Sequence, residues 1–442
     1  MTDYDENVHE DTKVERNESI WNGSASLVEI RRDLHAHPEA GWKEFRTTAL
    51  AATELDRQGF TIHLGDAAVA VDERLGVPDD RAITAARHRA YKEGVPEGLL
   101  KRMGDVTGLV AERTYGDGTG PVVGIRIDMD ALERVEARDE SHKPFRDGFV
   151  SRHPEEMHAC GHDGHTAIGI GLARQLDASD FDGTLKLFFQ PAEEGGRGAI
   201  PMSRSGHVDG VDYFAALHLG LGNETGKVIA GYDRPLCNCK FLVRFTGQSA
   251  HAGNAPQTGA NALQAATTAI QNLYAIPRHS AGASRVNVGK VSSPNGQNVI
   301  SDHAEMMIEV RGETTEINEY MMEKSNRIVT HSAEMHGVSY DIETYGKTTT
   351  FESDEEMVAS VSDSAAMVDG VTAVSTREQF GASEDASYLI KRVQEQGGKA
   401  TYIGIGSDHP DGHHTPYFDI DETSIQIAVD VLIETVETVG TR

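Results

Sequence analysis

The sequence has few cysteines and no apolar run long enough to span a membrane. Two of its three cysteines, Cys237 and Cys239, lie too close together to bridge across an extended strand. No disulfide framework is therefore expected, which fits a reducing cytoplasm. Residues 1–18 are polar and acidic, without the apolar core of a signal peptide, and are expected to be disordered or loosely attached. We predict a cytoplasmic protein with no membrane partner.

Positive charge is also scarce, because 41 lysines and arginines stand against 70 aspartates and glutamates, for a net charge of −29. Nucleic acid is excluded as a partner, since its phosphates would be repelled. The acidic residues are spread along the chain, and a dispersed carboxylate surface keeps a protein soluble at high salt, where screening removes self-repulsion. We interpret the charge as the mark of a halophilic source. An ordinary acidic enzyme is the alternative.

What the sequence does contain is a dense polar motif, Met157-His-Ala-Cys-Gly-His-Asp-Gly-His165, with three histidines, one cysteine and one aspartate. Core packing does not require such a cluster. Imidazole, thiolate and carboxylate are together the ligands of Zn²⁺, Mn²⁺ and Co²⁺. A structural or redox zinc site is the alternative, but structural sites usually carry paired cysteines, and only Cys160 lies here.

A second polar stretch, Gln190-Pro-Ala-Glu-Glu-Gly195, follows the apolar run Leu185-Lys-Leu-Phe-Phe189, which predicts a buried strand. Two adjacent carboxylates at the end of a buried strand suit a site where one binds metal and the other transfers a proton. A solvated turn is the alternative. The histidine motif upstream favours the metal site.

The length of 442 residues predicts more than one core, and alternating strand and helix signals predict an α/β fold with a largely parallel sheet. The predicted strands are 122–127, 185–189, 213–219 and 400–405, and the predicted helices are 24–34, 47–58, 166–176, 354–368 and one from 421. Asp128, Glu193, Glu194 and His218 lie at or just after the carboxyl ends of these strands. Open α/β sheets place their sites at these ends.

Residues 237–346 follow a different order, β-α-β-β-α-β, which is typical of a ferredoxin-like unit. Its strands are expected at 240–245, 285–291, 304–311 and 338–345, and its helices at 261–274 and 317–336. This unit is predicted to be inserted between the two parts of a larger domain, 19–236 and 347–442. Residues 66–117, with a charged helical segment at 83–103, are interpreted as an insertion beside the large sheet.

The chain resembles metallopeptidases of the aminoacylase and glutamate carboxypeptidase superfamily, in the amidohydrolase branch with the His-Ala-Cys-Gly-His-Asp motif. The likeness runs from Arg31-Arg-Asp-Leu-His35 to His414-Thr-Pro-Tyr-Phe-Asp-Ile-Asp421. Ser141-His-Lys-Pro-Phe-Arg-Asp-Gly-Phe149, Gly282-Ala-Ser-Arg-Val-Asn-Val288 and the insertion after Leu64 are most similar to p-aminobenzoyl-glutamate hydrolases. The resemblance implies a phosphorylase/hydrolase-like α/β/α catalytic domain with an inserted ferredoxin-like dimerisation or lid domain.

The resemblance also implies two divalent ions, Mn²⁺ or Zn²⁺, held by five side chains. The matching positions are Cys160, His162, Glu194, His218 and His414. His414 is preferred over the adjacent His413 because the ligand in the family directly precedes the Ser/Thr-Pro pair. Glu193 matches the general base, which binds no metal and can therefore carry the proton.

Further roles follow from the same resemblance. His251 matches a histidine that reaches into the site of the neighbouring protomer and donates to the oxyanion, with a turn residue as the alternative. Asn298 and Arg311 match substrate-binding residues. Arg311 would bind a substrate carboxylate through two parallel hydrogen bonds, with a strand-edge ion pair as the alternative. Asp128 and Asp163 are candidates for orienting ligand imidazoles, with packing or capping as the alternative.

The sequence thus predicts a dinuclear metal amidohydrolase for N-acyl amino acids with a free carboxylate, with p-aminobenzoyl-glutamate as the first substrate to test. N-acetyl and indole-acetyl amino acids are alternatives, because no acyl-pocket residue is identified. A non-catalytic assembly subunit is the alternative of another class, although every ligand and the base match. A homodimer is expected, or a dimer with a related second subunit.

Overall fold

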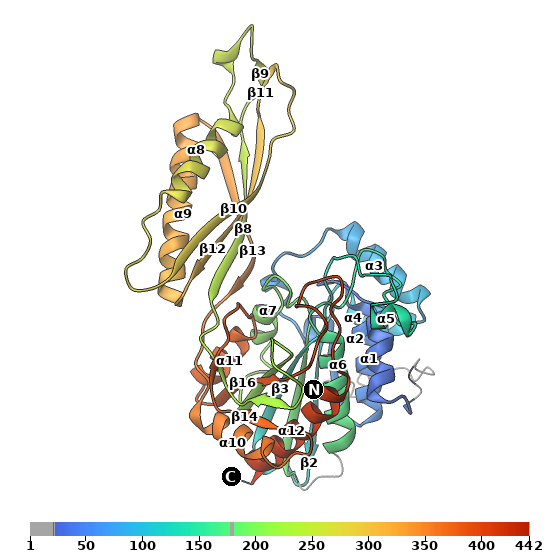
Figure 1. Ribbon diagram of the computed structural model, residues 1–442. Coiled ribbons are helices and arrows are strands. Elements are labelled where there is room, and N and C mark those ends of the chain that lie inside the picture. Colours follow the sequence, from blue (N-terminus) through green and yellow to red (C-terminus); the bar gives the residue numbers. More distant parts are fainter. Residues whose placement is uncertain (1–20, 22, 177–180, 442) are drawn as a thin grey trace, which may run out of the picture.

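The computed structural model describes residues 21, 23–176 and 181–441 (Figure 1). Residues 1–18, for which disorder is predicted, lie outside this set. The described chain forms two units, each built around its own sheet and its own hydrophobic cluster. Figure 1 shows the smaller unit projecting away from the larger one. Within the described residues, no helix is both long enough and apolar enough to cross a membrane.

The larger unit contains an eight-stranded sheet in the order β1-β2-β4-β3-β5-β16-β6-β14. Its strands are β1 Thr61–Leu64, β2 Leu109–Tyr115, β3 Val122–Asp128, β4 Gly183–Gln190, β5 Tyr213–Leu219, β6 Lys227–Ile229, β14 Ala373–Ser375 and β16 Lys399–Ile405. The four central strands, β4, β3, β5 and β16, are parallel, as predicted. After its first residue, each of β3, β5 and β16 is buried throughout, as expected for parallel strands covered on both faces.

Helices and short elements surround this sheet. They are α1 Leu27–Ala36, α2 Phe45–Arg57, α5 Lys143–Arg146, α6 His162–Gln175, α7 Ala199–Ser203, α10 Glu355–Ala365, α11 Ser387–Glu395 and α12 Thr423–Gly440, with the small pair β7 Tyr232–Asp233 and β15 Glu378–Gln379. A capping box of Ser26 and Glu29 starts α1. Helix α6 starts inside the histidine motif rather than after it. Gly161 precedes it with φ of 94°, a conformation that glycine adopts without strain.

The predicted insertion, 66–117, is only partly beside the sheet. Its first part forms η1 Gly65–Ala67, η2 Val71–Glu73, α3 Asp80–Lys92 and α4 Glu97–Met103. Its last part forms β2, which pairs with β1 on one side and β4 on the other, so the prediction is wrong there. Leu109, Val110 and Ala111 are fully buried. The charged residues Glu112 and Arg113 follow them and interrupt the apolar run that would predict a strand.

The smaller unit has the predicted β-α-β-β-α-β order and an antiparallel sheet in the order β10-β12-β8-β13. Its elements are β8 Cys237–Thr246, α8 Ala262–Tyr274, β10 Ser284–Ser292, β12 His303–Gly312, α9 Thr315–His336 and β13 Ser339–Thr348. Helices α8 and α9 pack on one face, where Phe241, Val243 and Phe245 of β8 are buried. Because side chains alternate along a strand, Asn238 and Lys240 project from the other face.

The tip of the smaller unit carries a separate two-stranded pair, β9 Ala250–His251 and β11 Val299–Ile300, with η4 Pro256–Thr258 beside it. Figure 1 shows this pair at the end farthest from the large sheet. The tip therefore lies away from the carboxyl ends of the central strands in the large sheet of the same chain.

Candidate metal centre

The loops that follow the central strands meet at one edge of the large sheet. Strands β4, β3 and β5 are parallel neighbours, so their carboxyl ends lie side by side. Asp128 ends β3, the Glu193-Glu194 pair follows β4, and His218 lies at the end of β5. Strand β16 pairs with β5, and the chain after it returns with His414. The predicted gathering of polar side chains at this edge is present.

The five predicted metal ligands come together there. Three overlapping groups have ligand atoms that all lie within 4.8 Å of one another: Cys160, His162 and His218; Cys160, Glu194 and His414; and His162, Glu193 and Glu194. Cys160 Sγ lies 3.5 Å from His218 Nε2, and His414 Nε2 lies 3.2 Å from Glu194 Oε1. Cys160 belongs to two of the groups, so its sulfur lies between two sets of donors.

Backbone carbonyls fix the tautomers of two of the imidazoles. His162 Nδ1 lies 2.8 Å from the carbonyl oxygen of Asp130, and His218 Nδ1 lies 2.7 Å from that of Leu219. A carbonyl only accepts, so each Nδ1 carries a proton, and each Nε2 has a free lone pair when its ring is neutral. Both histidines belong to a ligand group with Cys160, whose Sγ lies 3.5 Å from His218 Nε2. Metal-ligating histidines are usually oriented in this way.

The centre also contains polar atoms that lack partners. Among the described residues, His162 Nε2 and Glu194 Oε1 are buried without a hydrogen bond, although His414 lies close to the Glu194 oxygen. Burial opposes the charged form of His162, yet the carboxylate of Asp128 raises the pKa of this imidazole well above its usual range. The nearby Cys160 and Glu194 raise the pKa of His414 to about 10. Buried, unpaired donors in a negative field fit divalent cations.

One buried carboxylate that the sequence reasoning did not assign holds the glutamate pair in place. The two oxygens of Asp130 accept the backbone N–H groups of Glu193 and Glu194, each at 3.0 Å. Glu44 Oε1 accepts the N–H of Ala192 at 2.8 Å. Burial, together with the charges of Glu384 and Glu194, raises the pKa of Glu193. The repeated aspartate in Asp128-Met-Asp130 was the available signal for this role.

Asp128 lies next to the ligand imidazoles. Its Oδ1 is hydrogen-bonded to Nδ1 of His165, and its Oδ2 lies 3.6 Å from His162 Nε2. Nε2 of His165 accepts the backbone N–H of Leu219 at 2.9 Å, so the proton of this imidazole lies on the side of Asp128. Arg126 donates to Asp128 Oδ2 at 2.7 Å. Asp128 is thus close to one predicted ligand and holds a third histidine of the motif.

The side chain of Asp163 contacts helix α1 rather than the ligand imidazoles. It accepts from Arg31 Nε at 2.9 Å and lies 2.8 Å from His35 Nδ1. In the described part of the chain, its side chain has no contact with a ligand imidazole that would orient it. Its contacts join α6 to α1 and support the packing alternative.

The two adjacent histidines after β16 have different surroundings. His413 Nε2 accepts the backbone N–H of Leu221 at 3.0 Å, and His413 Nδ1 lies 3.6 Å from Cys160 Sγ. His414 forms a ligand group with Cys160 and Glu194. Its φ of 63° is uncommon for a residue with a side chain, and such backbones cluster at functional sites.

A cavity of about 440 Å³ opens over the centre, within the range of small-molecule sites. Cys160, Glu193, Glu194, His218 and His414 line it from the large unit, and Asn238, Lys240, Arg311 and Thr348 line it from the small sheet. The structure thus brings Arg311 to the site, as predicted. Lys240 and Asn238 were not assigned from the sequence, because strand register cannot be read from it.

His251 and Asn298 do not join this cavity. His251 is exposed on β9, and its Nδ1 accepts the backbone N–H groups of Gly253 and Asn254 at 3.1 and 3.2 Å. Asn298 is exposed beside it, and its carbonyl accepts the N–H of Ala252 at 2.9 Å. The two residues therefore lie together at the tip of the small unit, away from the ligands of their own chain (Figure 1).

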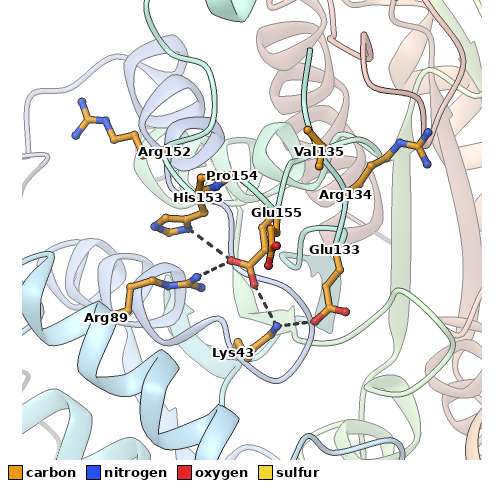
Figure 2. A pocket seen from close by; sticks show the side chains of 10 residues that line it. Lys43, Arg89, Glu133, Arg134, Val135, Arg152, His153, Pro154 and Glu155 are labelled. Carbon is orange, nitrogen blue, oxygen red and sulfur yellow. Dashed lines mark hydrogen bonds and ion pairs between the residues drawn. The ribbon is translucent and has the colours of Figure 1, made fainter. Parts of the chain in front are cut away.

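A larger cavity, of about 870 Å³, contains no predicted ligand (Figure 2). Figure 2 shows Lys43 reaching toward Glu133, which it contacts at 2.7 Å. Lys43 also contacts Glu156 at 3.1 Å, and Arg89 of α3 contacts Glu156 at 2.7 Å. These charges neutralise one another. The network links the first part of the predicted insertion to the residue just before the histidine motif.

Known proteins match nearly the whole chain. The profile of peptidase family M20/M25/M40 matches residues 124–438. Indole-3-acetyl-aspartic acid hydrolase of Enterobacter agglomerans is 44% identical, over 94% of this chain and 96% of that protein. A p-aminobenzoyl-glutamate hydrolase subunit from Escherichia coli strain K12 is 42% identical, over 95% and 97%. The crystal structure of an aminobenzoyl-glutamate utilization protein from Klebsiella pneumoniae is similar with a TM-score of 0.81 and 38% identity, over 93% of this chain and 95% of that chain.

Proposed function

Because the chain belongs to peptidase family M20/M25/M40 and is an enzyme that hydrolyses amide bonds, we propose that it is a dinuclear metal-dependent amidohydrolase acting on N-acyl amino acids with a free carboxylate. The observation that carries the proposal is the convergence of two donor groups that share Cys160, with Glu193 in the adjoining group. A non-catalytic assembly subunit is disfavoured, since no ligand or base is missing from the set.

The ligands divide into two sets in this proposal. His162 and His218 supply imidazole nitrogens on one side of Cys160, and Glu194 and His414 supply donors on the other. When bound, two divalent ions supply the Lewis acidity that activates water and polarises the substrate amide. The thiolate favours Zn²⁺, while the histidines and carboxylate also suit Mn²⁺.

The chain's own residues move the proton and hold the substrate. Glu193 takes the proton of the attacking water and delivers it to the leaving amine nitrogen. Asp130 keeps Glu193 and Glu194 in their relative positions through the two backbone hydrogen bonds. Arg311 binds the carboxylate of the amino acid, which orients the scissile bond toward the centre.

We assign His251 and Asn298 to the site of a neighbouring protomer. Their position at the tip, outside the cavity of their own chain, supports this assignment. His251 would donate to the oxyanion of the tetrahedral intermediate formed in the neighbour. A homodimer is the simplest assembly. A dimer with a related second subunit is the alternative, which is supported by the name of the Escherichia coli relative, because that protein is itself one subunit of a hydrolase.

The substrate proposal begins with p-aminobenzoyl-glutamate. The two relatives are named for conjugates of indole-3-acetate with aspartate and of p-aminobenzoate with glutamate. Indole-3-acetyl-aspartate is therefore the next substrate, and N-acetyl amino acids are the third class.

The test is a screen of the chain alone, loaded with Mn²⁺ or Zn²⁺, at high and low salt, against these three substrate classes. Release of the free amino acid is the measurement. We expect p-aminobenzoyl-glutamate to be hydrolysed with the highest kcat/KM. The same protein with Glu193→Gln is the control for contaminating hydrolases. If the metal-loaded chain, alone or with a related subunit, hydrolyses none of the three classes, the proposed function is wrong.

A further inference from the structure

The wall of the cavity that faces the metal ligands is built from the uncovered face of the small sheet. Asn238 and Lys240 lie two residues apart on β8, and Arg311 lies on β12 with its Cα paired to that of Asn238. Thr348 of β13 is paired to Asn238 on the other side. Because paired residues and residues two apart share one face, these four side chains form a continuous polar surface.

This surface carries two positive charges in a chain whose net charge is −29. Among the described residues, Lys240 makes no ion pair or hydrogen bond through its side chain. Glu309 is the residue opposite Lys240 in the ladder, yet Glu309 contacts Arg311, at 3.0 Å, instead. That contact uses one of the five N–H donors of the guanidinium, so most of them remain available. Lys240 is half-buried on the cavity wall, where its charge helps to lower the pKa of Glu194, but it has no direct ion pair among the described residues.

The same wall contains a buried polar atom without a partner. Asn238 is 3% exposed, and among the described residues its side-chain oxygen has no hydrogen bond. A purely structural strand would be expected to satisfy a buried amide and to pair its lysine with the glutamate opposite. The unpaired lysine and the unsatisfied amide both face the cavity that contains the metal ligands. A ligand with both anionic and N–H groups would satisfy them.

We propose that Lys240 and Arg311 form a two-cation site that selects N-acyl amino acids with a second carboxylate, namely conjugates of aspartate and glutamate. This inference rests on the proposed amidohydrolase function and adds the residue that sets specificity. Arg311 binds the α-carboxylate, because its planar fork fixes the orientation of the group next to the scissile bond. Lys240 binds the side-chain carboxylate. Its flexible stem and point charge tolerate the difference of one methylene between aspartate and glutamate.

The test compares two substrates that differ in one charge, p-aminobenzoyl-L-glutamate and p-aminobenzoyl-L-glutamine. The wild-type enzyme should prefer the glutamate conjugate in kcat/KM by roughly 10- to 100-fold, the range for a hydrogen bond to a charged group. Lys240→Met keeps the length of the side chain and removes its charge. We expect this variant to lose the preference because its kcat/KM for the glutamate conjugate decreases. Its kcat/KM for the glutamine conjugate should change by less than about 3-fold. Lys240→Arg should keep part of the preference.

Arg244→Met is the matched control. Arg244 lies on the same face of β8, four residues from Lys240, and contacts Glu305 and Glu343 outside the cavity. It should leave the activity on both substrates unchanged. Thermal midpoints of all variants test folding, and Lys240→Gln replaces Lys240→Met if the latter does not fold.

The outcomes separate this inference from the function on which it rests. If wild-type enzyme hydrolyses both conjugates equally, or if a folded Lys240 variant without the charge keeps the wild-type preference, the two-cation site is wrong and the amidohydrolase function stands. Equal losses on both substrates in such a variant would also overturn the role of Lys240. If the metal-loaded wild type, also with a related subunit, hydrolyses neither conjugate nor any other N-acyl amino acid, the proposed function fails, and this inference fails with it.

Discussion

The replacement of Asp130 by asparagine tests how the glutamate pair is held. Asp130 is 1% exposed, and its two oxygens accept the N–H groups of Glu193 and Glu194 at 3.0 Å. Asparagine has the same shape but only one acceptor oxygen, and its amide nitrogen would face the second N–H group. Asp130→Asn should therefore remove the hydrogen bond to the backbone N–H of either Glu193 or Glu194 while leaving the fold in place.

The magnitude follows from the lost hydrogen bond. A buried donor left without a partner costs about 1–3 kcal/mol, and a bond to a charged acceptor contributes about 1.5–3 kcal/mol. If about 2–3 kcal/mol of this loss destabilises the arrangement of Glu193 and Glu194 that is needed for catalysis, kcat/KM should decrease by roughly 30- to 150-fold. A loss of about 1.4 kcal/mol corresponds to a tenfold decrease. Metal content should decrease less than activity, because Glu194 is only one of the ligands of its group.

The assay is hydrolysis of p-aminobenzoyl-glutamate by metal-loaded protein, with bound metal and thermal midpoint measured on the same samples. Asp212→Asn is the matched control. The carboxylate of Asp212 accepts the N–H of Val122 at 2.8 Å, at the opposite end of β3. The control should keep activity within about 2-fold, the small effect usual for surface substitutions. If Asp130→Asn kept activity within about 3-fold of wild type, or if the control lost as much, the positioning role of Asp130 would be refuted.

Three further predictions follow from the site and the charge. Glu193→Gln should keep metal but lose kcat on the order of 10²-fold or more, whereas Glu194→Gln should lose metal; swapped phenotypes would reverse the assignment within the pair. His251→Ala and Glu193→Gln dimers should each be nearly inactive, but roughly a quarter of wild-type activity should return when they are refolded together in equal amounts, because half of the dimers are mixed and each has one intact site; mixed dimers confirmed by mass without activity would place His251 outside the partner's site. Thermal midpoints should rise steeply across a KCl series, because dilute buffer restores repulsion among the dispersed carboxylates; a flat response would remove the halophilic interpretation.

Local patterns in the sequence were sufficient for most of the central sheet. Strand β5 has the predicted bounds, and β3 and β4 extend the predictions by one residue or more at an end. These strands are continuous apolar runs, and burial on both faces requires such runs. Strand β2 was misplaced because its second half, from Glu112, is charged and partly exposed, so periodicity did not separate it from the helices before it.

The candidate ligands could be named from the sequence through the family resemblance, because they lie in short motifs or at strand ends, and the structure brings them together. The residues that hold the ligands could not. Asp130 acts on the glutamate pair through backbone groups about sixty residues away in sequence, and the register of β8 and β12 brings Lys240 and Arg311 to one wall. Contacts of this kind depend on tertiary packing, which local propensity does not encode. The opposite holds for His251 and Asn298. The sequence gives them roles in the active site, but they lie outside the cavity of their own chain, at the tip of the small unit.

The proposed hydrolysis requires two ions bound by the groups that share Cys160. The most direct measurement is a titration of metal-free protein with Mn²⁺ or Zn²⁺, in which bound metal and hydrolysis of p-aminobenzoyl-glutamate are measured together. We expect no activity without metal and an increase that ends at two bound ions per chain. Full activity in metal-free protein, or an increase that ends at one bound ion, would contradict it.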